Sequence, residues 1–235
     1  MPVAVQIHSG QVCAMSNYVI KYTRGAQVRY ISHLDFIRMF HRTVRRADLN
    51  MVFSQGFNPH PVMTVAMPLS VGVTSDGEYM KIGFEDGYGY TEESLKEKLN
   101  QALPAGFSVV AVRRTEGKEL DFAKFDRAKY RLEVLLRDSV FVDADAFLKN
   151  PEMIVLKKTK SGEKEADIRP YIYDLAVDSQ NGNNLTLSMC VAAGNTYNLK
   201  PETVLSAMEK YIPGFQLEAF LAHRVAILAG ENELL

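Results

Sequence analysis

The residues best suited to chemistry lie close together, between Ser32 and Pro61. This segment contains three of the five histidines and four arginines but only two acidic residues. In chain order the basic residues are His33, Arg38, His41, Arg42, Arg45, Arg46 and His60. Guanidinium and imidazolium groups bind phosphate and carboxylate oxygens through charge-assisted hydrogen bonds. The composition of this segment therefore predicts a binding site for an anionic partner.

The first part of this segment is predicted to be a helix. Ser32 is a typical N-cap with Asp35 at the capping-box position, and the helix is expected to end near Asp48. Its apolar face is predicted to consist of Leu34, Ile37, Phe40, Val44 and Ala47. The opposite face carries Arg38, His41, Arg42, Arg45 and, on its flank, Arg46. Like charges at this spacing repel one another, so RNA phosphates or an acidic protein surface would stabilise the face. The alternative is a solvated face that is neutralised by acids elsewhere in the fold.

Residues 54–61, Ser-Gln-Gly-Phe-Asn-Pro-His-Pro, are predicted to form a stiff recognition loop. Gly56 permits a close backbone approach, and the two prolines restrict the exit. Phe57, Asn58 and His60 would present a stacking ring, an amide and an imidazole, a set that suits single-stranded RNA. For Phe57 alone, insertion into the core is the favoured interpretation.

His33 and His60 are the candidate catalytic residues. Two histidines can cleave RNA by general acid–base catalysis without a metal ion. A metal site is not expected, because His33, Asp35 and His60 would converge only if the loop lies beside the helix start. The sequence contains no P-loop, GxGxxG, GxSxG, HExxH or CxxxCxxC motif. No cofactor is therefore predicted.

A second, smaller basic cluster is predicted later in the chain. A hairpin-like turn at Ser161-Gly162 is surrounded by four lysines, Lys157, Lys158, Lys160 and Lys164. Such a tip is usually just solvated. Alternatively, Lys158 and the nearby Arg169 extend a basic groove.

Hydrophobic periodicity predicts that an α+β fold carries these residues. Strands and helices are expected in the order β-α-β-β-α-β within residues 18–114, which is the ferredoxin-like arrangement. The same order is expected within residues 129–235. We therefore predict two tandem ferredoxin-like domains, with a charged linker over residues 115–128 and an N-terminal extension over residues 1–17.

Composition limits the class of protein. Of 235 residues, 47% are hydrophobic and 23% charged, as in ordinary soluble globular proteins. No apolar run approaches the roughly 18–20 residues that span a bilayer, and the first residues do not resemble a secretion signal. Cys13 and Cys190 lack metal-ligand spacing. We therefore expect a cytoplasmic protein without membrane contact.

Several motifs occur together along the chain. They are Ser32-His-Leu-Asp35, Arg45-Arg-Ala47, Ser54-Gln-Gly-Phe-Asn-Pro-His-Pro61, Pro68-Leu-Ser-Val-Gly72 and Asp167-Ile-Arg-Pro170. This combination resembles the bacterial radical-SAM-linked proteins, a family of unknown function. The resemblance implies a protein fused to, or encoded beside, a radical SAM enzyme, often among genes for RNA processing and ribosomal proteins. A weaker, architectural similarity is to CRISPR repeat-processing endoribonucleases, whose C-terminal Gly-rich loop this chain lacks.

Together, the residues and the resemblance predict an accessory RNA-binding module that acts with a radical SAM enzyme in tRNA or rRNA modification or processing. The helix arginines would hold phosphates, and Phe57, Asn58 and His60 would read the substrate. Two alternatives remain open. One is a metal-independent endoribonuclease, and the other is a protein-interaction module that docks on the partner enzyme.

Overall fold

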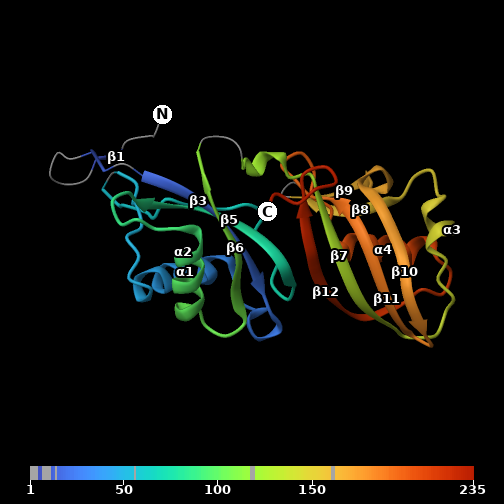
Figure 1. Ribbon diagram of the computed structural model, residues 1–235. Helices are drawn as coiled ribbons and strands as arrows, with labels where there is room; N and C mark the ends of the chain where they lie inside the picture. The colour runs from blue at the N-terminus through green and yellow to red at the C-terminus, as the bar shows by residue number, and fades with distance from the viewer. Residues whose placement is uncertain (1–4, 7–11, 14, 56, 117–119, 160–161) are drawn as a thin grey trace. The chain divides into compact units, whose positions relative to one another are not determined.

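The chain divides into two compact units, each described by itself below (Figure 1). Unit 1 comprises Met1–Phe122 with Leu234–Leu235, and unit 2 comprises Ala123–Glu233. The computed structural model describes residues 5–6, 12–13, 15–55, 57–116, 120–159 and 162–235. The fold is mixed α+β, with mostly antiparallel strands and few helices. Over the described ranges, no helix combines the length and the apolar character needed to cross a membrane.

Unit 1 alternates strands and helices around one sheet. Its main elements are β3 (Met15–Arg24), α1 (His33–Arg46), β4 (Met63–Val65), β5 (Thr74–Glu85), α2 (Glu92–Ala102) and β6 (Phe107–Thr115). The strand order across the unit is β4-β5-β3-β6, and each neighbouring pair is antiparallel. The smaller elements are β1 (Val5–Gln6), which pairs with β2 (Val12–Cys13), and the 3-10 turn η1 (Ala26–Val28). The first strand of the sheet, β3, therefore begins inside the predicted extension.

The core of unit 1 lies between this sheet and its two helices. α1 and α2 lie side by side, and their buried side chains join those of the strands in one cluster (Figure 1). The helical members of the cluster are Phe36, Phe40, Val44, Leu95 and Leu99. Removing each such side chain from water contributes about 1.5–3 kcal/mol. These contacts hold α1 against the sheet and determine which of its faces meets solvent.

The buried face of α1 is shifted from the predicted one. Leu34, which the periodicity places on the apolar face, is 66% exposed, whereas Phe36 is buried. The Phe36 ring stacks on Tyr22 with centroids 5.1 Å apart and also contacts the Phe107 ring. The other predicted residues do pack on the core, namely Ile37, Phe40, Val44 and Ala47. Leu34 thus belongs to the arginine face.

The main strands of unit 2 also form antiparallel pairs. Its elements are η2 (Phe122–Lys124), β7 (Arg127–Leu136), α3 (Ala144–Leu148), β8 (Ile154–Thr159), β9 (Gly162–Asp167), η3 (Arg169–Tyr171), β10 (Ile172–Asn181), β11 (Asn184–Ala192), α4 (Pro201–Tyr211) and β12 (Leu217–Leu228). The strand order is β10-β11-β7-β12. The β8–β9 hairpin forms a separate ladder at the predicted basic turn. Ser161 and Lys160 of that turn lie outside the described residues.

Truncation of Phe40 should destabilise the protein strongly. We expect Phe40→Ala to lower the free energy of unfolding by about 3–5 kcal/mol, because the ring is 1% exposed and its removal leaves a cavity. Leu34→Ala, on the exposed face of the same helix, should change it by less than about 0.5 kcal/mol. Urea denaturation followed by circular dichroism measures both values. Equal losses of stability in the two variants would contradict the observed orientation of α1.

Candidate functional site

α1 begins with the predicted cap. The Asp35 backbone N–H donates to Ser32 Oγ at 3.2 Å, and Ser32 Oγ donates to the Asp35 carboxylate at 2.8 Å. The serine oxygen thereby satisfies one of the free N–H groups of the first turn. Because this cap and the buried face fix the start and rotation of α1, the positions of its exposed side chains are also fixed.

Three arginines project from the exposed face of α1. Arg38 forms an ion pair with Asp35 at 3.3 Å, and both side chains are more than half exposed, so the pair contributes little. Arg42 and Arg45 are exposed, and their guanidinium groups make no hydrogen bond or ion pair with any residue that the structure describes. Their guanidinium donors therefore face solvent and are open to an external anion.

Arg46 has a different role. Its Nη2 donates to the Ala102 carbonyl at 2.8 Å and to Thr43 Oγ1 at 3.0 Å, and its Nε donates to the same carbonyl at 3.3 Å. Ala102 is the last residue of α2, where carbonyls lack helical partners. Arg46 thus ties the end of α2 to α1, and this use of its donors distinguishes it from Arg42 and Arg45.

The loop from Ser54 to Pro61 is closed at its base. The Ser54 N–H donates to the His60 carbonyl at 2.6 Å, and the His60 N–H donates to Ser54 Oγ at 2.9 Å. Just outside this pair, Phe53 and Pro61 form an antiparallel bridge. Gly56, singled out from the sequence, lies outside the described residues. The closed base holds the rest of the loop as a compact protrusion.

The tip of this loop points into solvent. Phe57 is 107% exposed, so the interpretation that its ring inserts into the core is wrong. Met51 and Val52, just before the loop, are buried instead. Asn58 and His60 are also exposed. All three predicted loop residues are therefore accessible to a ligand.

His41 connects the helix with the loop. Burial lowers the pKa of His41, and the positive charges of Arg45 and His60 lower it further. His60 is thus an electrostatic neighbour of His41. We define the α1–loop surface as His41 together with the exposed basic side chains of the helix and the exposed side chains of the loop, namely Arg38, Arg42, Arg45, Phe57, Asn58 and His60.

The remaining sequence candidates do not join this surface by any described contact. His33 is exposed in the first turn of α1. Among the described residues, no group of three or more His, Cys, Asp or Glu is placed to hold a metal ion. Lys158 lies in β8, but its side chain is outside the described part of the structure. Arg169 donates to the Leu148 carbonyl at 2.8 Å and the Ile172 carbonyl at 3.1 Å, so it links α3 to β10.

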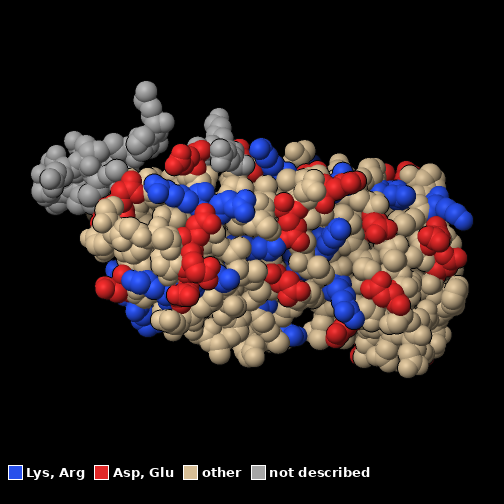
Figure 2. Space-filling model, viewed as in Figure 1, with Lys and Arg blue, Asp and Glu red and all other residues tan. Residues whose placement is uncertain are grey.

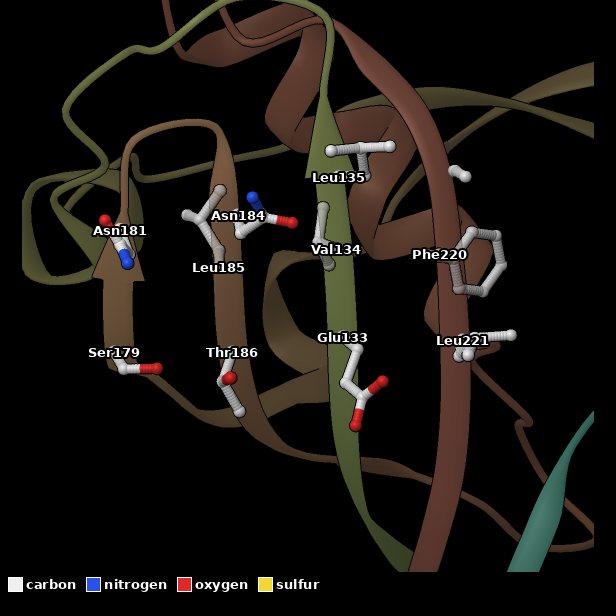
Figure 3. Close-up of a pocket in the computed structure, with 11 residues that line it drawn as sticks. Glu133, Val134, Leu135, Ser179, Asn181, Asn184, Leu185, Thr186, Phe220 and Leu221 are labelled. Atoms are coloured by element: carbon white, nitrogen blue, oxygen red, sulfur yellow. The ribbon is translucent and has the colours of Figure 1, made fainter. Parts of the chain in front are cut away.

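A groove on the sheet of unit 2 was not predicted from the sequence. Its volume is about 450 Å³, and residues from β10, β11, β7 and β12 line it (Figure 3). Glu133 lies between Thr186 and Leu221, its partners on the two neighbouring strands. The lining of the groove combines hydroxyl, amide and apolar groups with the single carboxylate of Glu133. It includes no Lys or Arg. The groove is therefore not suited to phosphate.

Charge is mixed on the face of the protein that Figure 2 shows. Lys and Arg side chains are interspersed there with Asp and Glu over both units. This agrees with the net charge of −1 for the whole chain. The four arginines of α1, with one acidic residue in the same helix, are a local excess of positive charge.

Comparisons with solved structures find only distant likenesses. A Cbf5-Nop10-Gar1 complex matches with a TM-score of 0.45 and 10% identity over 89% of this chain and 48% of that chain. An H/ACA RNP bound to a substrate RNA containing 2'-deoxyuridine matches with a TM-score of 0.42 and 11% identity, over 88% and 46%. An unknown protein from Galdieria sulphuraria gives a TM-score of 0.27 and 13% identity, over 90% and 99%. The chain thus spans about half the length of the first two, and values this low carry no information on shared function.

A comparison with curated proteins finds no match. A family model does match, over residues 17–201, and thus over most of the chain, including all of the α1–loop surface. The protein therefore belongs to DUF2344, a family described as uncharacterised proteins conserved in bacteria.

Proposed function

We propose that this protein is an RNA-binding module and that the α1–loop surface is its binding site. The observation that carries the proposal is the pair Arg42 and Arg45, two exposed guanidiniums without a partner among the described residues. Leaving two like charges one helical turn apart disfavours the free protein, and a bound phosphate offsets this repulsion. The arginines would therefore bind the backbone of the nucleic acid.

The adjacent loop supports RNA over an acidic protein as the ligand. Phosphate contacts position a nucleic acid, whereas contacts to the bases select its sequence. Phe57 and Asn58 provide a ring and an amide on a closed loop beside the arginines, and His60 adds an imidazole. An acidic protein surface would use the arginines but has no particular need for an exposed ring and amide.

We further infer that both units are ferredoxin-like domains. In unit 1 the strands, numbered along the chain, lie across the sheet in the order fourth, first, third, second. Unit 2 has the same order when the β8–β9 hairpin is treated as an insertion. This agreement, together with the two helices of each unit, supports the tandem arrangement and a boundary within residues 115–128.

The proposed partner is a radical SAM enzyme that modifies or processes tRNA or rRNA. The support is the resemblance of Ser32-His-Leu-Asp35 and Ser54–Pro61 to radical-SAM-linked proteins. In this proposal the protein binds the RNA and presents it to the enzyme. Copurification from the native cell, with identification of bound protein and RNA, tests this part of the proposal.

RNA cleavage is a second candidate function, favoured by the proximity of His41 and His60. A neutral imidazole can act as general base and a protonated one as general acid. For a binding module, labelled RNA incubated with the protein and EDTA should remain intact. Cleavage that disappears in both His41→Ala and His60→Ala would instead support a metal-independent endoribonuclease.

Reversal of two charges on α1 should abolish RNA binding. We expect the Arg42→Glu/Arg45→Glu variant to show none of the salt-dependent gel shift of the wild type, because two attractive interactions with phosphate become repulsive. Substitution of Arg42 and Arg45 by alanine is milder. It should make the negative slope of log K against log salt shallower, by about 0.7 for each phosphate of a single-stranded RNA that is no longer neutralised.

The matched control is Lys129→Glu/Lys149→Glu. It makes the same change in net charge at two exposed lysines of unit 2, and it should bind RNA as the wild type does. Absence of RNA binding by the wild type at low salt would overturn the proposal. If RNA binding is weakened equally in both variants, the change in net charge alone explains the effect.

RNA affinity should increase as the pH falls from about 8 to about 6. The pKa of His41 is below its ordinary value in the free protein, so its imidazole is mostly neutral near pH 7. A phosphate beside it favours the protonated form, so binding takes up a proton and tightens at lower pH. His41→Gln should weaken this dependence, and His223→Gln in unit 2 should leave it unchanged. Fluorescence anisotropy across the pH range measures the slope, and an unaltered slope in His41→Gln would exclude His41 from the site.

A further inference from the structure

A second exposed aromatic ring lies at the start of α1. Tyr30 is 74% exposed, although it is only two residues before the N-cap, Ser32. An exposed aromatic ring next to the helix that carries the arginines is available to stack on a ligand. Tyr30 belongs to none of the motifs singled out from the sequence.

Buried Arg24 makes the turn that carries Tyr30 rigid. Arg24 is 4% exposed and donates from Nε to the Val28 carbonyl at 3.2 Å. Its Nη2 donates to the Arg29 carbonyl at 2.9 Å and also to the Ile31 carbonyl. The Gly72 N–H donates to the same Arg29 carbonyl at 2.8 Å. The backbone on both sides of Tyr30 is thus held by hydrogen bonds.

The two exposed rings stand at different points along one helix. Tyr30 lies just before α1, whereas Phe57 belongs to the loop whose His60 is an electrostatic neighbour of His41, near the middle of the helix. With a rise of about 1.5 Å per residue, His41 lies about 12 Å along the axis from His33. Arg38 lies between the two points, and Leu34 adds an exposed apolar side chain to the same face.

We infer that Tyr30 and Phe57 are two stacking platforms and that the substrate of the α1–loop surface is single-stranded RNA. This inference rests on the proposed function. Bases in a duplex are stacked on one another, and side chains cannot enter the deep, narrow major groove of A-form RNA. Unpaired bases expose their faces and stack on aromatic rings, while cations follow the backbone. Arg38, Arg42 and Arg45 would bind the phosphates that join the stacked bases.

The absence of tryptophan from the sequence allows a direct test. Tyr30→Trp and Phe57→Trp each introduce a single indole, whose fluorescence a stacked base quenches. We expect quenching when a short single-stranded oligoribonucleotide is added, and none with the same strand annealed to its complement. Phe141→Trp is the matched control, because Phe141 is 81% exposed but lies in unit 2, and its fluorescence should not change.

Affinity provides the second measurement. Tyr30→Ala should weaken binding of the single strand about tenfold, and Tyr30→Phe, which keeps the ring, should retain the wild-type affinity. One outcome is that the Arg42→Glu/Arg45→Glu variant loses RNA binding while neither indole is quenched in the tryptophan variants. That result overturns the stacking inference and leaves the proposed function standing. Equal affinity for the duplex also overturns the inference. If no RNA binds, both fail.

Discussion

The packing of α1 against the sheet of unit 1 is the constraint on which the candidate site depends. Phe36, Phe40 and Val44 are buried on one side of the helix, so the side chains half a turn away must meet solvent. Arg38, Arg42 and Arg45 occupy that opposite side. Rotation of the helix by one residue would bury a guanidinium, at a cost of several kcal/mol, and expose a phenylalanine. The same hydrophobic contacts that stabilise the unit therefore hold the charges at the surface.

Five arginines of this protein show two different uses of the guanidinium group. Arg24, Arg46 and Arg169 donate to backbone carbonyls at the ends of turns, helices and strands. In each case the guanidinium joins two segments of the backbone. Arg42 and Arg45 have no such acceptor among the described residues. The residue type is the same in both groups. The groups differ in whether a backbone carbonyl lies within hydrogen-bond distance of the guanidinium.

The distance along the chain between contacting residues explains how much of the site could be predicted from the sequence. The cap at Ser32 and the helix follow from local spacing, and these two predictions are confirmed. The exposure of Arg38, Arg42 and Arg45 on one side of the helix also follows from their spacing. The role of Arg46 depends on Ala102, which is 56 residues away in the chain, and no local pattern indicates that contact. The exposure of Leu34 depends on the rings of Tyr22 and Phe107, which select Phe36 for the core. The groove of unit 2 draws its lining from four strands, so it becomes visible only after they pair.

The closed base of the Ser54–Pro61 loop separates recognition from folding. Its two closing hydrogen bonds use the backbone of Ser54 and His60 and one serine hydroxyl, and none involves Phe57 or Asn58. Exchange of the tip residues should therefore leave the folding free energy nearly constant. If the loop binds RNA as proposed, new specificities would arise there by single substitutions, without the decrease in stability that accompanies most changes in a core.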